Sequence, residues 1–129
     1  MSLPDDAPAR RRARGLGIEA EFFARVWLRA TGWRILAASY KASGGEIDII
    51  ARRRDLVAFV EVKARADRDA ALFAIDGPKQ RRMSRAARHW LARNRPHQGC
   101  NFRGDAILVT PWRLPEKVEG AFALDLGSA

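Results

Sequence analysis

Hydrophobic positions along the chain follow two spacings, one typical of helices and one typical of strands. From Gly17 to Ala30, apolar side chains recur at about every fourth position, which predicts an amphipathic helix whose apolar stripe includes Phe22 and Val26. Three short runs rich in β-branched and aromatic residues then predict strands at 33–40, 46–51 and 56–63. The loop between the last two runs is short and charged, so we expect those strands to form an antiparallel hairpin.

A second helix and two more strands are predicted in the carboxy-terminal half. Residues 64–78 show no regular pattern and end in Asp-Gly-Pro, which is typical of a helix start. The helix is expected over 79–94 and is ended by the Arg-Pro pair that follows. Strands are predicted at 105–110 and 121–126. The order α-β-β-β-α-β-β indicates an α/β fold.

The first fourteen residues differ in composition from the rest of the chain. They are polar, contain proline and end in a cluster of arginines, which predicts a flexible basic arm over 1–14. The remaining residues, 15–129, are expected to form a single domain, because 129 residues fit the usual size of one domain and 47% of them are hydrophobic.

Composition excludes several classes of protein. The single cysteine, Cys100, excludes an intramolecular disulfide and a zinc site built from several cysteines, and it favours a reducing compartment. No apolar run approaches the roughly 20 residues needed to span a bilayer. The basic residues near the amino terminus are followed by no apolar segment, so no signal peptide is expected. We therefore expect a cytoplasmic protein with no membrane partner.

The charge balance favours a polyanionic partner. Lysine and arginine number 24 against 15 aspartate and glutamate residues, a net charge of +9 that attracts nucleic acid. Twenty of these cations are arginine, which binds phosphate with two parallel hydrogen bonds, although codon usage in a GC-rich genome would explain that ratio equally well. The predicted helix at 79–94 carries cations opposite its apolar positions, so it is either a phosphate-binding face or an ordinary solvated surface. The candidate nucleic-acid-binding residues are Lys79, Arg81, Arg82, Arg85, Arg88 and Arg65.

Acidic residues interrupt the two central predicted strands. Because side chains alternate along a strand, Glu46 and Asp48 lie on the same side of their strand, as Glu61 and Lys63 do on theirs, and antiparallel pairing puts all four on one face of the hairpin. A hairpin loop at 53–56 would place Asp48 opposite Glu61 and Glu46 opposite Lys63. Close carboxylates repel one another unless a cation lies between them, and hard oxygen ligands select Mg²⁺ or Mn²⁺. The pattern predicts such a metal site, and a sheet face with cross-strand ion pairs is the alternative.

The spacing of these residues resembles that of the PD-(D/E)XK nuclease superfamily, which includes type II restriction enzymes and archaeal Holliday-junction resolvases. More narrowly, the chain resembles the YraN-like family of uncharacterised bacterial proteins. The resemblance spans about residues 15–110. It is carried by Gly17-x3-Glu21-x2-Ala24-x3-Leu28-x3-Gly32, Gly44-Gly45-Glu46-Ile47-Asp48-Ile49-Ile50, Val57-x-Phe59-Val60-Glu61-Val62-Lys63-x-Arg65 and Lys79, with a weaker match at Arg103-x-Asp105.

The resemblance implies a restriction-endonuclease-like core, in which a mixed β-sheet is flanked by helices. It implies that Asp48 and Glu61 ligate the metal and that Lys63 is the catalytic lysine. Glu21, on the first helix, matches an acidic residue that many superfamily members add to the metal site, whereas the alternative is an ordinary surface glutamate. Glu46 belongs to the matching motif as a supporting residue. The position before Asp48 is isoleucine where the superfamily motif has proline, which leaves the carboxylate in place.

These observations lead to one main hypothesis and two alternatives. We expect a metal-dependent nuclease that hydrolyses phosphodiester bonds in DNA or structured nucleic acid, with DNA favoured over RNA. A catalytically silent nucleic-acid-binding module on the same fold is the first alternative, and a basic RNA-associated scaffold of the ribosomal type is the second. The complete set of Asp48, Glu61 and Lys63 favours the enzyme, because a pure binder gains nothing from acids beside phosphates. A homodimer is compatible with the sequence and is not required by it.

Overall fold

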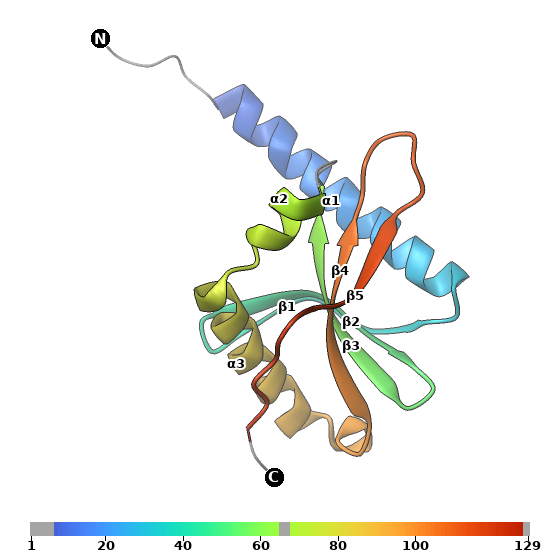
Figure 1. The fold of residues 1–129 in the computed structure, drawn as a ribbon, viewed down its shortest axis with the longest axis vertical. Helices are drawn as coiled ribbons and strands as arrows, with labels where there is room; N and C mark the ends of the chain where they lie inside the picture. Colours follow the sequence, from blue (N-terminus) through green and yellow to red (C-terminus); the bar gives the residue numbers. More distant parts are fainter. Residues whose placement is uncertain (1–6, 65–67, 128–129) are drawn as a thin grey trace.

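Five strands form one mixed sheet, and helices lie on both of its faces (Figure 1). The computed structural model describes residues 7–64 and 68–127. Along the chain, the elements are α1 (Ala7–Ala30), β1 (Arg34–Ala42), β2 (Gly45–Arg53), β3 (Leu56–Lys63), α2 (Arg68–Phe73), α3 (Gly77–Arg93), the 3₁₀ turn η1 (Arg95–His97), β4 (Asn101–Leu108) and β5 (Glu116–Phe122). In the part of the chain so described, no helix combines the length and the apolar character needed to cross a membrane.

The strands lie in the sheet in their sequence order, β1-β2-β3-β4-β5. Strands β1, β2 and β3 pair antiparallel, whereas β3 and β4 pair parallel, and β5 returns antiparallel to β4. A parallel pair requires a connection that crosses from one end of the sheet to the other, and the segment with α2 and α3 supplies it. This crossover brings the start of α3 back to the end of β3.

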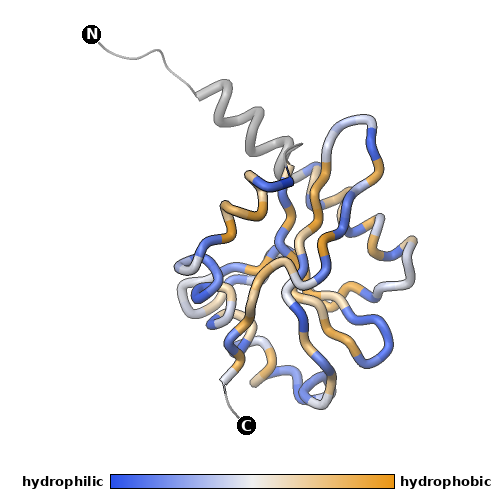
Figure 2. Tube along the Cα trace, viewed as in Figure 1, coloured by the Kyte–Doolittle hydropathy of each residue, from blue (hydrophilic) through white to orange (hydrophobic). Residues whose placement is uncertain are grey.

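Two helices cover opposite faces of the sheet. Val57 and Phe59 of β3 pack in one buried cluster with residues of α3, whereas the alternate residues Ala58 and Val60 pack in another with residues of α1. The helical partners are Ala86, Ala87 and Trp90 of α3 and Ala24 and Leu28 of α1. The hydrophobic segments gather accordingly in the central strands, between the two helices (Figure 2).

The hairpin and the start of α3 confirm the sequence-based predictions. Strands β2 and β3 pair from Arg53↔Leu56 to Ile49↔Val60, which is the register expected from the charged loop. Asp76 caps α3, because its side-chain Oδ1 accepts a hydrogen bond from the Lys79 backbone N–H at 3.0 Å. A proline in the first turn completes the predicted start signal.

Helix α1 differs from its prediction in length and in the face that it buries. It begins at Ala7, so residues 7–14 of the predicted arm are helical, in keeping with the high helix propensity of alanine and arginine. The rest of the predicted arm lies outside the described residues. The predicted apolar stripe is not the buried one: Phe22 and Val26 are exposed, whereas Ala20, Ala24 and Leu28 face the sheet. Small residues on the buried face allow the helix to approach the strands closely.

The carboxy-terminal third contains the other differences. Strand β4 starts at Asn101, four residues earlier than predicted, and the last strand is β5 at Glu116–Phe122 instead of 121–126. Residues 68–73, predicted as irregular, form the short helix α2. The apolar pattern at 121–126 arises instead because Leu124 and Leu126 pack against α3, where the Asp125 backbone N–H donates to Ser84 Oγ at 2.9 Å.

Replacing Gly45 by alanine is expected to destabilise the fold, because Gly45 lies directly against the backbone of α3. A Cβ atom there would lie 2.0 Å from the Arg82 carbonyl oxygen, so the β1–β2 hairpin would be pushed away from the helix. We expect the free energy of unfolding to fall by roughly 1–3 kcal/mol in urea titrations. Gly99→Ala is the control, since a Cβ atom there meets nothing within 4 Å. Equal stabilities of the two variants would refute this packing argument.

Candidate active site

Strands β2 and β3 separate at one end of the hairpin, and Asp48 lies in the fork between them. The strand pairing ends at Ile49↔Val60, one position before Asp48 and Glu61. Beyond that point, Asp48 Oδ2 accepts a hydrogen bond from the Val62 backbone N–H at 2.8 Å. A side-chain oxygen thus satisfies a backbone donor that the partner strand leaves free, and this bond fixes the carboxyl group between the two strands.

Asp48 is close to two further carboxyl groups, one on each side of the fork. The pKa of Asp48 is raised from 3.8 to about 8, mainly by burial and next by the negative charge of Glu61. The hydrogen bond from the Val62 N–H acts in the opposite direction and lowers it. The charge of Glu21 on α1, and a hydrogen bond with its carboxyl group, raise this pKa further. Glu21 is itself 3.5 Å from the Ser39 hydroxyl on β1. The first helix therefore does bring its acidic residue to the fork.

Glu61 is buried and is paired with two lysines. It has a relative exposure of 5%, and the side chains of Lys63 and Lys79 both approach its Oε1 atom. The Nζ atom of Lys79 is 2.5 Å from this oxygen, and that of Lys63 is 3.4 Å from it. Lys63 belongs to the same strand as Glu61, whereas Lys79 comes from the first turn of α3. Two cations from different elements thus meet on one carboxylate oxygen.

The two lysines differ in how firmly they hold their protons. Burial lowers the pKa of Lys63, and the neighbouring Lys79 lowers it further, against the opposing effect of Glu61. Burial also acts to lower the pKa of Lys79, but the hydrogen bond and the charge of Glu61 outweigh it, so the pKa of Lys79 is raised. The ammonium group of Lys79 is therefore the stronger partner of Glu61.

An open cleft of about 630 Å³ gives access to this cluster from the side of α3 and the β1–β2 hairpin. Asp48 and Glu61 lie at its lining together with four other charged residues, which are Lys41, Glu46, Lys79 and Arg82. Lys63 contacts Glu61 and Glu21 contacts Asp48, although neither is part of the lining. The cleft therefore exposes two carboxyl groups beside several cations.

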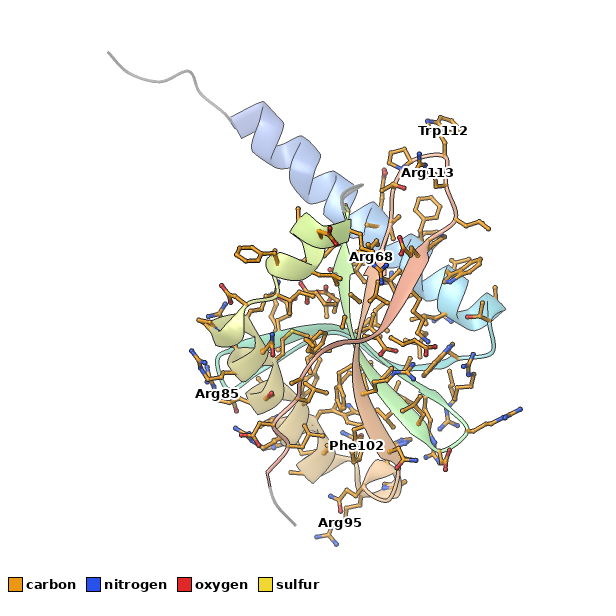
Figure 3. All side chains as sticks on the ribbon, viewed as in Figure 1. Arg68, Arg85, Arg95, Phe102, Trp112 and Arg113 are labelled. Atoms are coloured by element: carbon orange, nitrogen blue, oxygen red, sulfur yellow. The ribbon has the colours of Figure 1, made fainter. Side chains whose placement is uncertain are left out.

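The remaining predicted site residues differ in whether they lie at the cleft, on the surface of α3 or elsewhere. Glu46 is exposed at its rim, and Arg81 is exposed on α3. Arg85 donates from Nε to the Ser43 carbonyl at 3.2 Å, and Figure 3 shows it at the outer surface of α3. Arg88 is directed elsewhere, because it donates to the Asp125 carbonyl at 2.5 Å. Arg65 lies outside the described residues.

Sequence reasoning placed Lys79 on a nucleic-acid-binding face and missed its contact with Glu61. No local pattern signals this contact, because the two residues are joined only through the crossover connection. A second missed feature is the fully buried Asp105, which accepts two hydrogen bonds from Arg103, at 2.6 and 2.9 Å, and one from the Gly120 N–H at 3.0 Å. Asp105 is fully hydrogen-bonded and links β4 to β5, so its role is structural.

A second hollow, of about 860 Å³, lies between α1 and the β4–β5 loop. Its lining is mainly apolar and includes Phe23, Trp27, Trp112 and Leu114. Trp112 is fully exposed at the tip of the loop, as Figure 3 shows. Among the described residues, no cluster of reactive side chains lines this hollow. The fork is therefore the candidate active site.

The donor atoms at the fork fit a hard divalent cation. Among residues 7–64 and 68–127, no three acidic, histidine or cysteine side chains are arranged to enclose a metal ion by themselves. Mg²⁺ does not need such a cage, since it usually takes one or two carboxylates and completes its shell with water and phosphate oxygens. Asp48 and Glu61, which lie at the lining of one cleft, supply that number of carboxylates.

Replacing Asp48 by asparagine is expected to change how stability depends on pH. Because the native pKa of about 8 lies above the ordinary value of 3.8, the folded protein binds one more proton than the unfolded chain between these pH values. Wild-type stability therefore falls as pH rises through this window, and it levels off above it. The asparagine side chain cannot titrate and keeps an oxygen for Val62. Urea titrations at several pH values should show the variant gaining stability over wild type as pH rises, and a constant difference would contradict the raised pKa.

The fold and the fork together define an α/β protein with a carboxylate–lysine site at the opening of a central hairpin. The family model described as the uncharacterised protein family UPF0102 matches residues 20–109. The UPF0102 protein of Methylorubrum populi is 52% identical over 96% of this chain and 100% of its own length. That of Methylorubrum extorquens is 50% identical over 97% of this chain and 98% of its own length. The UPF0102 protein of Rhodopseudomonas palustris is 49% identical over 90% of this chain and 91% of its own length.

The chain therefore belongs to the UPF0102 family. This is the YraN-like family identified from the sequence, and it lies within the restriction-endonuclease-like superfamily. The matched range contains Glu21, Asp48, Glu61, Lys63 and Lys79, so the whole fork lies inside the part of the chain that defines the family.

Proposed function

We propose that this protein is a metal-dependent nuclease that hydrolyses phosphodiester bonds in nucleic acid. One observation carries the proposal: Asp48 and Glu61 meet at the β2–β3 fork, beside two lysines, at the lining of an open cleft. Two carboxyl groups held close together raise each other's free energy of ionisation, and groups perturbed in this way are concentrated at functional sites. Its position at the lining of a cleft, in a chain of net charge +9, favours use on an anionic polymer.

The topology supports a restriction-endonuclease-like core. An antiparallel three-stranded unit, a helical crossover and a parallel fourth strand follow α1, and they form the mixed sheet with flanking helices that the resemblance implies. In this arrangement the ends of β2 and β3 that carry the acidic residues, the start of α3 and one flank of α1 converge on the fork.

Each residue at the fork has a chemical role in the proposed hydrolysis. Asp48 and Glu61 would hold Mg²⁺ or Mn²⁺, which when bound activates water and polarises the phosphodiester. Glu21 contacts Asp48 and orients it. Lys63 is close enough to Glu61 to orient the attacking water or to neutralise charge that develops on the phosphate. The proposed catalytic residues are thus Asp48, Glu61, Lys63 and Glu21.

Cations beside the cleft would hold the nucleic acid by its phosphates. Arg82 lines the cleft, and Arg85 lies three residues further along α3, beside the β1–β2 turn. Arg85 keeps guanidinium N–H groups for phosphate, since its bond to Ser43 uses Nε. Contacts of this kind do not depend on sequence, so we propose that DNA is bound through its backbone and shape.

Replacing Arg82 and Arg85 by glutamine is expected to weaken nucleic-acid binding by a similar factor for unrelated sequences. Each lost phosphate contact should also reduce the slope of log affinity against log salt by about 1. Fluorescence anisotropy at several salt concentrations measures both quantities. Arg88→Gln is the matched control on the same helix, because Arg88 is held by Asp125. An unchanged affinity and an unchanged slope in the double variant would indicate that this face of α3 is an ordinary solvated surface that does not bind nucleic acid.

A catalytically silent nucleic-acid-binding module is the second candidate. The observation that favours it is that two ammonium groups already neutralise Glu61. The two candidates are distinguished by a cleavage assay with the purified protein on linear, supercoiled, flap, branched and RNA substrates, with Mn²⁺ or Mg²⁺ and with a chelator. If the protein is a nuclease, at least one substrate should be cleaved when the metal is present and not when the chelator is added. Binding without product on the whole panel would favour the silent module.

A further inference from the structure

We propose that Lys79 is a built-in counter-ion of Glu61, which a divalent metal ion displaces and which then pairs with the substrate phosphate. The inference rests on the proposed nuclease function and adds a regulatory step to that site. It assigns Lys79 a role different from that of Lys63, although both lysines contact the same carboxylate oxygen.

The geometry places Lys79 where an incoming metal ion would bind. Its Nζ atom is the closer of the two cations to Glu61 Oε1, at 2.5 Å against 3.4 Å for Lys63. Lys79 also lines the cleft, whereas Lys63 does not. An ion that enters from the cleft and binds Glu61 therefore meets the ammonium group of Lys79 first.

Electrostatics opposes the binding of a divalent ion to Glu61 while Lys63 and Lys79 both remain on it. Two like charges at hydrogen-bond or metal-ligand distance from one atom repel each other strongly in a partly buried site. Of the two lysines, Lys79 makes the shorter ion pair with Glu61. Metal binding to Glu61 must therefore overcome this ion pair, which makes Lys79 a competitor of the metal.

The fold lets Lys79 leave Glu61 without disturbing the helix. Its backbone is fixed by the Asp76 cap and by the proline of the first helical turn. Its side chain is a flexible four-carbon stem beside an open cleft of about 630 Å³ that Arg82 and Lys41 also line. Once displaced, the ammonium group would join these cations where a phosphate binds. Lys63 would remain as the counter-charge behind Glu61.

Manganese affinity in the absence of nucleic acid tests the competition directly. Isothermal titration calorimetry should show Mn²⁺ binding to Lys79→Gln about tenfold more tightly than to wild type, because one charge-assisted contact no longer has to be broken. Lys79→Arg, which keeps the charge, should bind Mn²⁺ as weakly as wild type. Arg82→Gln is the control for a general change in cleft charge, and its affinity should remain within about threefold of wild type, since a partly solvated charge acts weakly at a distance.

The outcomes separate this inference from the proposed function. Equal Mn²⁺ affinity in wild type and Lys79→Gln, or the same gain in Arg82→Gln, would overturn the role of Lys79 alone. No Mn²⁺ binding in any variant would overturn the nuclease proposal together with the inference. Thermal unfolding of each variant shows that a change in affinity is not a loss of fold.

Lysine side-chain nuclear magnetic resonance gives a second readout that does not depend on cleavage. The chain has four lysines, so ¹⁵N-labelled ammonium signals can be assigned with single substitutions. Adding Mg²⁺ should shift or broaden the Lys79 signal as it leaves Glu61, whereas Lys117, which lies 3.6 Å from Asp105, should be unaffected. A Lys79 signal that stays unchanged at saturating Mg²⁺ would show that the ion pair is static and would overturn the proposal.

Discussion

Asp48→Asn is expected to abolish cleavage while leaving nucleic-acid binding equal or tighter. Asparagine is close in size and keeps an oxygen for the Val62 N–H, so the fork should retain its shape. It cannot supply an anionic ligand, and we expect the cleavage rate to fall by a factor of about 10³, the upper end of the range seen when one preorganised group is removed from an active site. Binding should not weaken, because asparagine adds no negative charge that could repel the phosphate backbone.

Single-turnover cleavage and anisotropy on the same substrate measure these two effects. Glu119→Gln is the matched control, since Glu119 is an exposed carboxylate outside the cleft that pairs with Arg103. It should cleave at the wild-type rate. Equal losses of cleavage and binding in Asp48→Asn would point to a damaged fold, and unimpaired cleavage would remove Asp48 from the mechanism.

Lys63→Ala is expected to reduce cleavage by a factor of about 10²–10³, the usual cost of losing one preorganised group at a developing charge. Metal affinity should remain close to that of wild type, because Lys63 is not at the lining of the cleft and Lys79, the proposed competitor of the metal, is unchanged in this variant. Cleavage at saturating metal, combined with Mn²⁺ calorimetry, separates the two quantities.

Lys41→Ala is the matched control for this second prediction. Lys41 lines the same cleft and is exposed, without an ion pair to Glu61. Its loss should weaken substrate binding and leave the rate at saturating substrate unchanged. If Lys41→Ala and Lys63→Ala lower the cleavage rate equally, Lys63 contributes only to the positive electrostatic potential of the cleft.

The hairpin could be predicted from the sequence because its geometry is local. Two apolar strands joined by a short charged loop leave few registers, and only one face of each strand carries the acidic residues. The same periodicity is enough to place Asp48 near Glu61 without tertiary information. The capped start of α3 is equally local, since Asp76 bonds to a backbone only three residues away.

Features that depend on tertiary packing could not be predicted in this way. Helix α1 buries Ala24 and Leu28 and leaves Phe22 exposed, and the spacing of apolar residues alone does not fix which face of the helix meets the sheet. The contact between Lys79 and Glu61 depends on where the crossover returns α3 to the sheet. The apolar tail at 121–126 has the pattern of a strand, but Leu124 and Leu126 pack on α3, and Figure 1 shows the path of the chain there.

We propose that the β2–β3 fork holds a divalent metal ion with which the protein cleaves nucleic acid. The most direct test is the cleavage rate of wild-type protein as a function of Mn²⁺ concentration, measured with the bound Mn²⁺ followed by electron paramagnetic resonance in the same samples. We expect the rate to rise in proportion to Mn²⁺ bound at Asp48 and Glu61 and to vanish when a chelator removes it. Nucleic acid that stays intact while the protein binds it, with no bound Mn²⁺ at any concentration, would contradict a metal-dependent nuclease.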